Sequence, residues 1–186
     1  MKSQTLRSAL AVAATATALL AATGTAHAAP TTPSPAPAAA GGAMDAQLQV
    51  KYGSKCLTIA GGSLRNGAHA IEGTCDTTAL HQVFTVRPGE TTGWEIVAAH
   101  SGRCLTHRAS STAAVVQDWC NGSPAQRWTM QFLEGAELNL FQLRPVDAPG
   151  ECLSMGGTPA GEEPTAYVVD CFTNLPSQEW RLAFVN

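Results

Sequence analysis

Three regularly spaced cysteines constrain this chain more than any other feature of its sequence. Cys56, Cys104 and Cys152 recur at intervals of 48 residues, and each is followed by Leu and then by a hydroxyl residue. A fixed interval of this length is typical of proteins built from repeated structural units. The sequence therefore predicts three copies of one unit.

The far end of each unit repeats as well. A second cysteine (Cys75, Cys120 or Cys171) is followed six or seven residues later by Gln, a variable residue and an aromatic residue. These motifs are Gln82 with Phe84, Gln126 with Trp128, and Gln178 with Trp180. A buried Gln that bonds nearby backbone groups would hold a turn together, so we interpret the three glutamines as structural.

Apolar residues alternate with other residues on both sides of these motifs. The alternating positions are Leu48 and Val50, Phe84 and Val86, Trp94 and Ile96, Trp128, Met130 and Phe132, Phe141 and Leu143, and Trp180, Leu182 and Phe184. A period of two over short runs, interrupted by Gly, Pro and Asn, is typical of β-strands. Residues 44–186 show no convincing helical pattern, and we expect an all-β domain.

The first 43 residues differ in composition from the remainder. Residues 1–28 have a charged start, an apolar run and a small-residue end, which predicts a secretory signal peptide. Residues 29–43 are rich in Pro, Ala and Gly, and we expect a flexible tail. Residues 44–186 have the length of one ordinary domain. The protein is therefore expected to be secreted, without insertion into a membrane.

All six cysteines lie in the predicted domain. In an exported chain an even number of cysteines indicates disulfides, although counting alone leaves 15 pairings open. If each unit closes its own loop, Cys56 pairs with Cys75, Cys104 with Cys120, and Cys152 with Cys171. The chain has no Cys-x-x-Cys or His-x-His spacing, so we expect neither a metal nor a cofactor.

The charge of the domain argues against a nucleic-acid partner. Residues 1–43 hold two of the eleven basic residues and none of the fourteen acidic ones, which leaves residues 44–186 with a net charge of −5. No run of Lys or Arg could form a basic patch. No nucleophile motif or paired carboxylates are apparent either, and we expect no enzymatic activity.

Three units with Cys-Leu near the start and Gln-x-aromatic near the end resemble the ricin B-type lectins and related carbohydrate-binding modules. The resemblance covers Leu48 to Val185. It implies a β-trefoil of three four-stranded lobes, near residues 47–92, 93–139 and 140–186, with shallow sugar sites in the lobes. The implied partner is a polysaccharide or glycan, and we expect the protein to be a monomer.

The residues that usually bind sugar in this family are replaced here. An Asp commonly follows Cys-Leu, where this chain has Thr58, Thr106 and Ser154. An aromatic residue commonly lies two positions before the second Cys, where this chain has Gly73, Asp118 and Val169. Since a neutral hydroxyl accepts hydrogen bonds more weakly than a carboxylate, we expect a weak or displaced sugar site.

The middle lobe offers the main candidate site, made of Thr106, His107, Asp118 and Trp119. The loop between its cysteines is three residues shorter than in the other lobes, which could bring Trp119 into the platform position. The alternative is that Trp119 packs against the disulfide or a neighbouring loop.

In the third lobe, Ser154 and Tyr167 form a smaller candidate, beside an Asp170 that we interpret as structural. A rival function is a trefoil that has lost sugar binding and acts on a protein, as a protease inhibitor or a toxin-associated factor.

Overall fold

The computed structural model describes residues 42–53, 55–109, 114–135, 139–156 and 164–185. By its internal contacts the chain divides into two units, Met1–Ala38 and Ala39–Asn186, and all described residues belong to the second. The predicted signal peptide (1–28) and nearly all of the predicted tail (29–43) lie outside the described residues. Across the described ranges, no helix is both long and apolar enough to cross a membrane.

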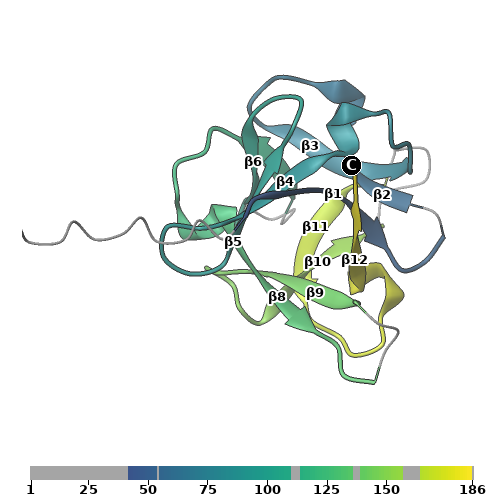
Figure 1. Ribbon diagram of the computed structural model, residues 1–186. Helices are drawn as coiled ribbons and strands as arrows, with labels where there is room; N and C mark the ends of the chain where they lie inside the picture. The colour runs from purple at the N-terminus through teal and green to yellow at the C-terminus, as the bar shows by residue number, and fades with distance from the viewer. Residues whose placement is uncertain (1–41, 54, 110–113, 136–138, 157–163, 186) are drawn as a thin grey trace, which may run out of the picture. The chain divides into compact units, whose positions relative to one another are not determined.

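Six strands close into a barrel (Figure 1). They are β1 (Met44–Val50), β4 (Phe84–Pro88), β5 (Trp94–Ala98), β8 (Arg127–Phe132), β9 (Phe141–Pro145) and β12 (Trp180–Phe184). The ring is closed because β1 pairs antiparallel with both β4 and β12, for example Ala46 with Phe84 and with Phe184. These strands coincide with the segments in which apolar residues alternate, because alternate side chains of a strand point into the barrel.

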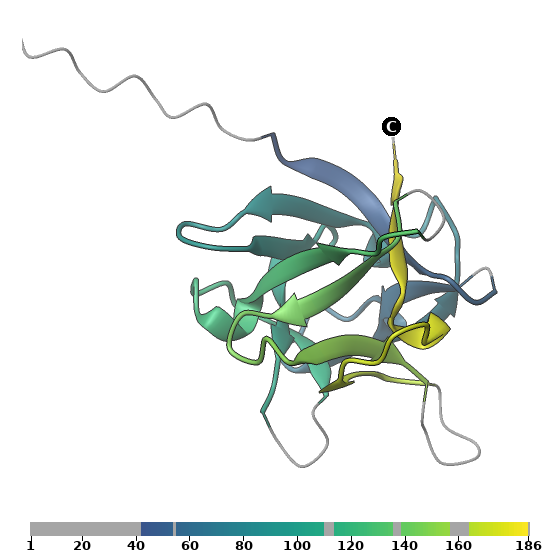
Figure 2. The same cartoon turned by 90° about the horizontal axis from the view of Figure 1, so that it is seen from below.

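Three hairpins lie at one end of the barrel and contact one another (Figure 2). They are β2 (Lys55–Ile59) with β3 (Ala68–Thr74), β6 (Arg103–His107) with β7 (Val115–Asp118), and β10 (Glu151–Met155) with β11 (Ala166–Asp170). Ala68 pairs with Gln117, Ile71 with Thr165, and Ala114 with Tyr167. A barrel with three hairpins at one end is the β-trefoil fold, which confirms the predicted fold class.

Short 3-10 turns carry the glutamines of the repeat. They are η2 (Leu80–Gln82), η3 (Pro124–Gln126) and η4 (Pro176–Gln178), while η1 (Ala60–Gly62) follows β2. Each glutamine turn leads into a barrel strand whose aromatic residue, Phe84, Trp128 or Trp180, is fully buried. The repeated Gln-x-aromatic motif therefore marks the point where the chain enters the barrel.

Each repeat contains one disulfide, as predicted. The bonds join Cys56 to Cys75, Cys104 to Cys120, and Cys152 to Cys171, with a Cα–Cα distance of 5.0 Å in all three. They close loops with sequence separations of 19, 16 and 19 residues. Because each disulfide ties the start of a hairpin to the segment after it, the hairpin and the following turn are held together.

The turn between β4 and β5 requires glycine at Gly93. This residue has a φ of 79°, and a Cβ there would lie 2.9 Å from the carbonyl oxygen of Trp128. Glycine alone meets both conditions without strain. The tight turn lets β5 approach β8 and brings Trp94 opposite Trp128.

Candidate functional site

The three glutamines hold equivalent turns. In each lobe the side-chain oxygen accepts from the backbone N–H after the second cysteine, and the side-chain nitrogen donates to the carbonyl oxygen before it. The distances are 2.8 Å throughout, with Asp76 and Thr74 for Gln82, Asn121 and Trp119 for Gln126, and Phe172 and Asp170 for Gln178. All three side chains are buried. The three glutamines therefore stabilise turns in the interior and are not available to a ligand.

The hydroxyl residues after Cys-Leu also lie in the interior. Thr58 and Thr106 donate to the carbonyl oxygens of Cys56 and Cys104 at 3.1 and 2.9 Å, and the Ser154 hydroxyl lies 3.3 Å from that of Ser177. All three are buried. A sugar hydroxyl would have to displace these internal partners to reach them.

The usual platform positions offer no aromatic face. A Cβ at Gly73 would overlap the hydroxyl oxygen of Thr58, so a larger side chain could not be accommodated there without a shift. Asp118 binds Arg108 through both carboxylate oxygens at 2.9 Å and accepts from the backbone N–H of Gly67 at 3.1 Å. Asp118 therefore joins the first and middle lobes.

Trp119 is an aromatic residue that the middle lobe presents to solvent beside its disulfide. Its exposed fraction is 64 %, and the guanidinium carbon of Arg103 lies 4.1 Å from the ring centroid. Arg103 donates to the Asn66 side chain at 2.8 Å and to the carbonyl oxygen of Ser101 at 3.1 Å. One face of the indole is thus covered by a fixed cation, and a ligand would stack on the opposite face.

His107 lies apart from Trp119. Its side chain is buried, and Nδ1 lies 3.3 Å from a carboxylate oxygen of Asp147. The structure therefore does not bring the four predicted middle-lobe residues together. Thr106 accepts a hydrogen bond from Gln126, and His107 contacts Asp147. Asp118 binds Arg108, whereas Trp119 is exposed to solvent.

In the third lobe, Ser154 and Tyr167 are direct partners across strands β10 and β11. Tyr167 is half-buried, and its neighbourhood includes Tyr52, whose hydroxyl donates to Glu72. Burial, and then the Glu72 carboxylate, raise the pKa of Tyr52 well above its ordinary value. Asp170 is exposed, and its carbonyl oxygen accepts from Gln178, which fits the structural interpretation.

Sequence reasoning missed the polar surroundings of Trp119. In the sequence, a charged residue precedes each repeated cysteine, and Arg103 is one of these; Asn66 lies 37 residues before Arg103, in the first lobe. Their meeting depends on the pairing of β3 with β7, which one sequence does not reveal. Among the described residues, no group of three His, Cys, Asp or Glu side chains could hold a metal ion.

Comparison with known proteins finds one family match. Residues 80–167 match the family model for the ricin-type beta-trefoil lectin domain-like proteins. No curated protein matches the sequence.

Several solved structures share the fold at low sequence identity. A designed threefold-symmetric protein, ThreeFoil, is 21% identical with a TM-score of 0.66, over 76% of this chain and 99% of its own. An exo-beta-1,3-galactanase from Clostridium thermocellum is 21% identical with a TM-score of 0.62, over 76% of this chain and 30% of its own. A Polyporus squamosus lectin, bound to a sialylated epitope, is 16% identical with a TM-score of 0.61, over 77% of this chain and 49% of its own.

This chain thus spans less than half of the galactanase and of the fungal lectin. Two lectins among the structural neighbours, the Polyporus squamosus lectin and the hemolytic lectin CEL-III, share this β-trefoil fold with the chain. The resemblance predicted from the repeats is confirmed, because residues 80–167 match the ricin-type beta-trefoil lectin domain-like model and the solved structures share the β-trefoil fold.

Proposed function

We propose that this chain is a secreted, non-catalytic carbohydrate-binding protein whose main sugar contact is Trp119. The observation that carries the proposal is the exposed indole, 64 % accessible, with Arg103 fixed against one of its faces. An aromatic face stacks on the C–H groups of a sugar ring, and nearby donors bind its hydroxyls. The guanidinium has five N–H donors, more than its bonds to Asn66 and Ser101 require.

The proposed site is displaced from the usual one, and its affinity is low. Thr106 is buried and bonded internally, so no carboxylate or hydroxyl from that position adds to the Trp119 surface. Binding then rests on one stacking contact and on surface hydrogen bonds, which water weakens. Avidity for a polysaccharide would come from several chains on one polymer.

Secretion belongs to the same proposal. Disulfides form and persist mainly in oxidising compartments, and this domain has three. Residues 1–28 have the pattern of a signal peptide. We infer that cleavage after residue 28 leaves the tail from residue 29 ahead of the trefoil from residue 44, and that the protein is a monomer in solution.

The test is a glycan and polysaccharide array with the full chain and with Trp119→Ala. The substitution keeps the Trp119 carbonyl oxygen that Gln126 binds, so the fold should persist. We expect binding at least about ten-fold weaker in the variant. Phe172→Ala is the matched control, because Phe172 is an exposed aromatic next to the third-lobe disulfide, and it should bind normally.

A second function is favoured by the interior position of the family's sugar-binding residues. Thr58, Thr106 and Ser154 are buried, and Gly73 has no room for a platform. A trefoil with these features could present its loops to a protein, as a protease inhibitor or toxin-associated factor does. A blank array from folded, oxidised protein would contradict sugar binding and support this alternative.

A further inference from the structure

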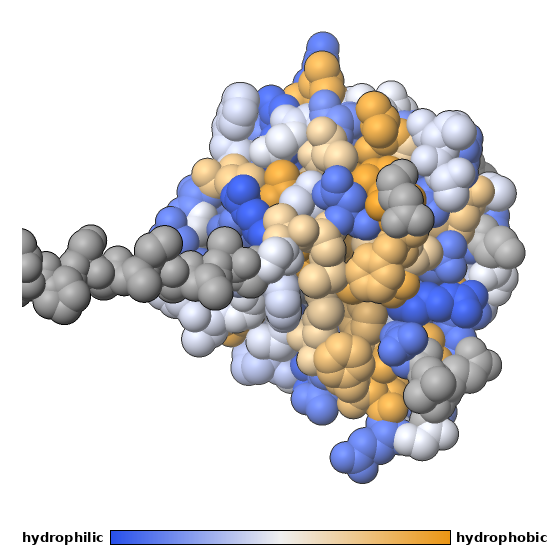
Figure 3. Space-filling view, in the orientation of Figure 1, coloured by the Kyte–Doolittle hydropathy of each residue, from blue (hydrophilic) through white to orange (hydrophobic). Residues whose placement is uncertain are grey.

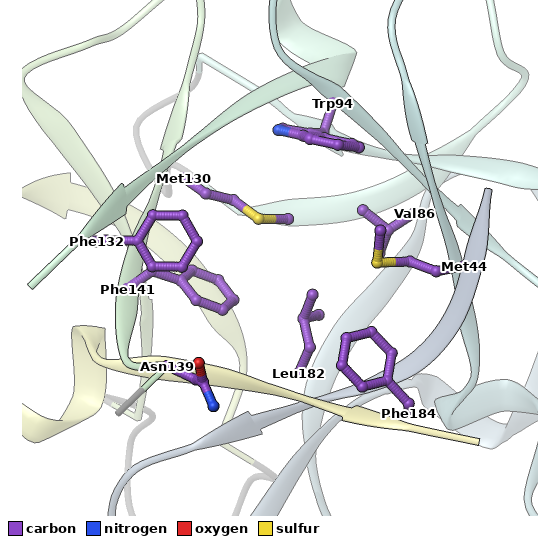
Figure 4. A pocket seen from close by; sticks show the side chains of 9 residues that line it. All are labelled: Met44, Val86, Trp94, Met130, Phe132, Asn139, Phe141, Leu182 and Phe184. Carbon is purple, nitrogen blue, oxygen red and sulfur yellow. The ribbon is translucent and has the colours of Figure 1, made fainter. Parts of the chain in front are cut away.

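An apolar hollow occupies the open end of the barrel, away from Trp119. Its volume is about 330 Å³, and it lies among the ends of β1, β4, β5, β8, β9 and β12 (Figure 4). Figure 3 shows apolar side chains gathered over the middle of this face. Neither the lectin resemblance nor the proposed sugar contact uses this hollow.

The hollow arises because the first lobe supplies small residues where the other lobes supply large ones. The strand register makes Ala46, Trp94 and Phe141 equivalent, since they pair with Phe84, Trp128 and Trp180 respectively. Val86, Met130 and Leu182 form a second equivalent set, because each lies two residues after Phe84, Trp128 or Trp180. Ala46 and Val86 are the smallest side chains of these two sets. Because they fill less of the barrel than their counterparts in the other lobes do, a space remains on the first lobe's side of the barrel axis.

Burial decreases steadily from the bottom of the hollow to its opening. Val86 and Phe141 form a buried floor at 0 % and 2 % exposure, whereas Phe132 and Phe184 form a rim at 62 % and 64 %. Trp94, Met130 and Leu182 are half-buried between them. The shape is a blind hollow that opens at one end, as a site for the end of a chain would require.

The chemistry of the lining is uncharged. Met44 and Met130 contribute flexible thioethers, which adapt to the shape of an apolar ligand. The polar groups of the lining side chains are the Asn139 amide, which is exposed, and the indole N–H of Trp94. An ionic or strongly hydrated group inside would lose water without gaining partners, whereas a hydrocarbon would gain contacts on all sides.

We propose that this hollow binds the hydrocarbon chain of a single-chain amphiphile, with the polar head left at the rim near Asn139. At about 30 Å³ for a group of the size of water, the hollow has space for roughly eleven such groups, which leaves room for an alkyl chain of about eight carbons. Because the floor lies beneath the rim, a narrow chain reaches it and a flat protein surface does not.

Methyl NMR tests this proposal with 1-octanol as the probe. We expect the Met44 and Met130 methyl signals to shift saturably as octanol is added to the full chain, because both line the hollow. Met155 is the internal control, since it is buried in the core and does not line the hollow. Equal shifts at all three methionines, or none, would overturn the proposal.

Val86→Met tests the cause of the hollow. It gives the first lobe the residue that the middle lobe has at this position, and we expect octanol binding to weaken at least ten-fold. Phe184→Asp places a charge at the exposed rim, should weaken binding as well, and leaves the buried floor intact. Phe172→Asp is the matched control, because Phe172 is similarly exposed but lies outside the hollow.

Two outcomes would contradict the assignment. Octanol binding that is unchanged in both Val86→Met and Phe184→Asp would place the ligand elsewhere. Met44 and Met130 signals that depend on protein concentration, and that octanol leaves unchanged, would show that a second copy of the chain occupies the hollow.

Discussion

The indole N–H of Trp128 donates to the carbonyl oxygen of Leu105 at 3.1 Å, and so joins the two ends of the middle repeat. Trp180 makes the same bond to Leu153 at 2.9 Å in the third repeat. In both repeats the acceptor is the Leu of the Cys-Leu motif. The two motifs recur together because they contact each other, except in the first repeat, where Phe84 has no N–H to donate.

Replacing Trp128 by Phe should destabilise the protein by about 2 kcal/mol, because a buried carbonyl oxygen loses its donor and a smaller ring leaves space in the core. Urea unfolding followed by circular dichroism measures the change. Trp119→Phe is the control, since Trp119 is exposed, and it should alter stability by less than about 0.5 kcal/mol. Equal stability of wild type and Trp128→Phe would show that the bond contributes nothing.

Replacing Gln126 by Ala should cost more, about 3 kcal/mol. The side chain binds the N–H of Asn121, the carbonyl oxygen of Trp119 and the hydroxyl of Thr106, and its loss leaves buried polar groups without partners. Gln131→Ala removes the same side chain from an exposed position of β8 and should be nearly neutral. Chemical denaturation of the two variants compares them directly, and a neutral Gln126→Ala would contradict the structural interpretation.

Removing the middle disulfide with the double substitution Cys104→Ser and Cys120→Ser should lower the free energy of unfolding by about 3 kcal/mol. The estimate follows from the entropy that a loop of this length, with a separation of 16 residues, regains in the unfolded chain. Thermal unfolding under oxidising conditions measures it. Under reducing conditions the wild type loses all three disulfides, so an unchanged melting temperature there would be inconsistent with this account.

The sequence predicted the fold because the trefoil repeats its contacts three times. The cysteines and glutamines of the two motifs have their partners within their own repeat, as Gln126 has in Trp119 and Asn121, so the motif recurs in each repeat of the sequence. The alternation that ends at Phe132 or Phe184 likewise marked the barrel strands.

The site was less predictable because its contacts cross between repeats. Arg103 reaches Asn66 in the first lobe, and His107 reaches Asp147 in the third, and neither pair has a counterpart in the repeat pattern. The hollow depends on a difference of volume at Ala46 and Val86 that appears only when strand register aligns the lobes. Where the sequences of the repeats differ, the contacts of one repeat cannot be predicted from those of another.

His100 offers a pH-dependent test of packing between the first and middle lobes. Its Nε2 lies 3.1 Å from the carbonyl oxygen of Ser63, and its ring centroid is 6.3 Å from that of His81. Burial lowers the pKa of His100 below its ordinary 6.5, and the charges of His81 and Arg103 lower it further, whereas the bond to Ser63 opposes the shift. The folded protein therefore favours neutral His100.

Because the folded-state pKa is the lower one, the unfolded chain binds the proton more readily as the pH falls below about 6.5. The stability from neutral His100 is fully present above that pH and is lost as the pH falls through the folded-state pKa. We expect His100→Gln to reduce the slope of unfolding free energy against pH between pH 7 and pH 5, measured by urea denaturation at each pH. His69→Gln changes an exposed histidine and should leave the slope as in the wild type. A slope that His100→Gln does not change would mean that the ring is protonated equally in both states.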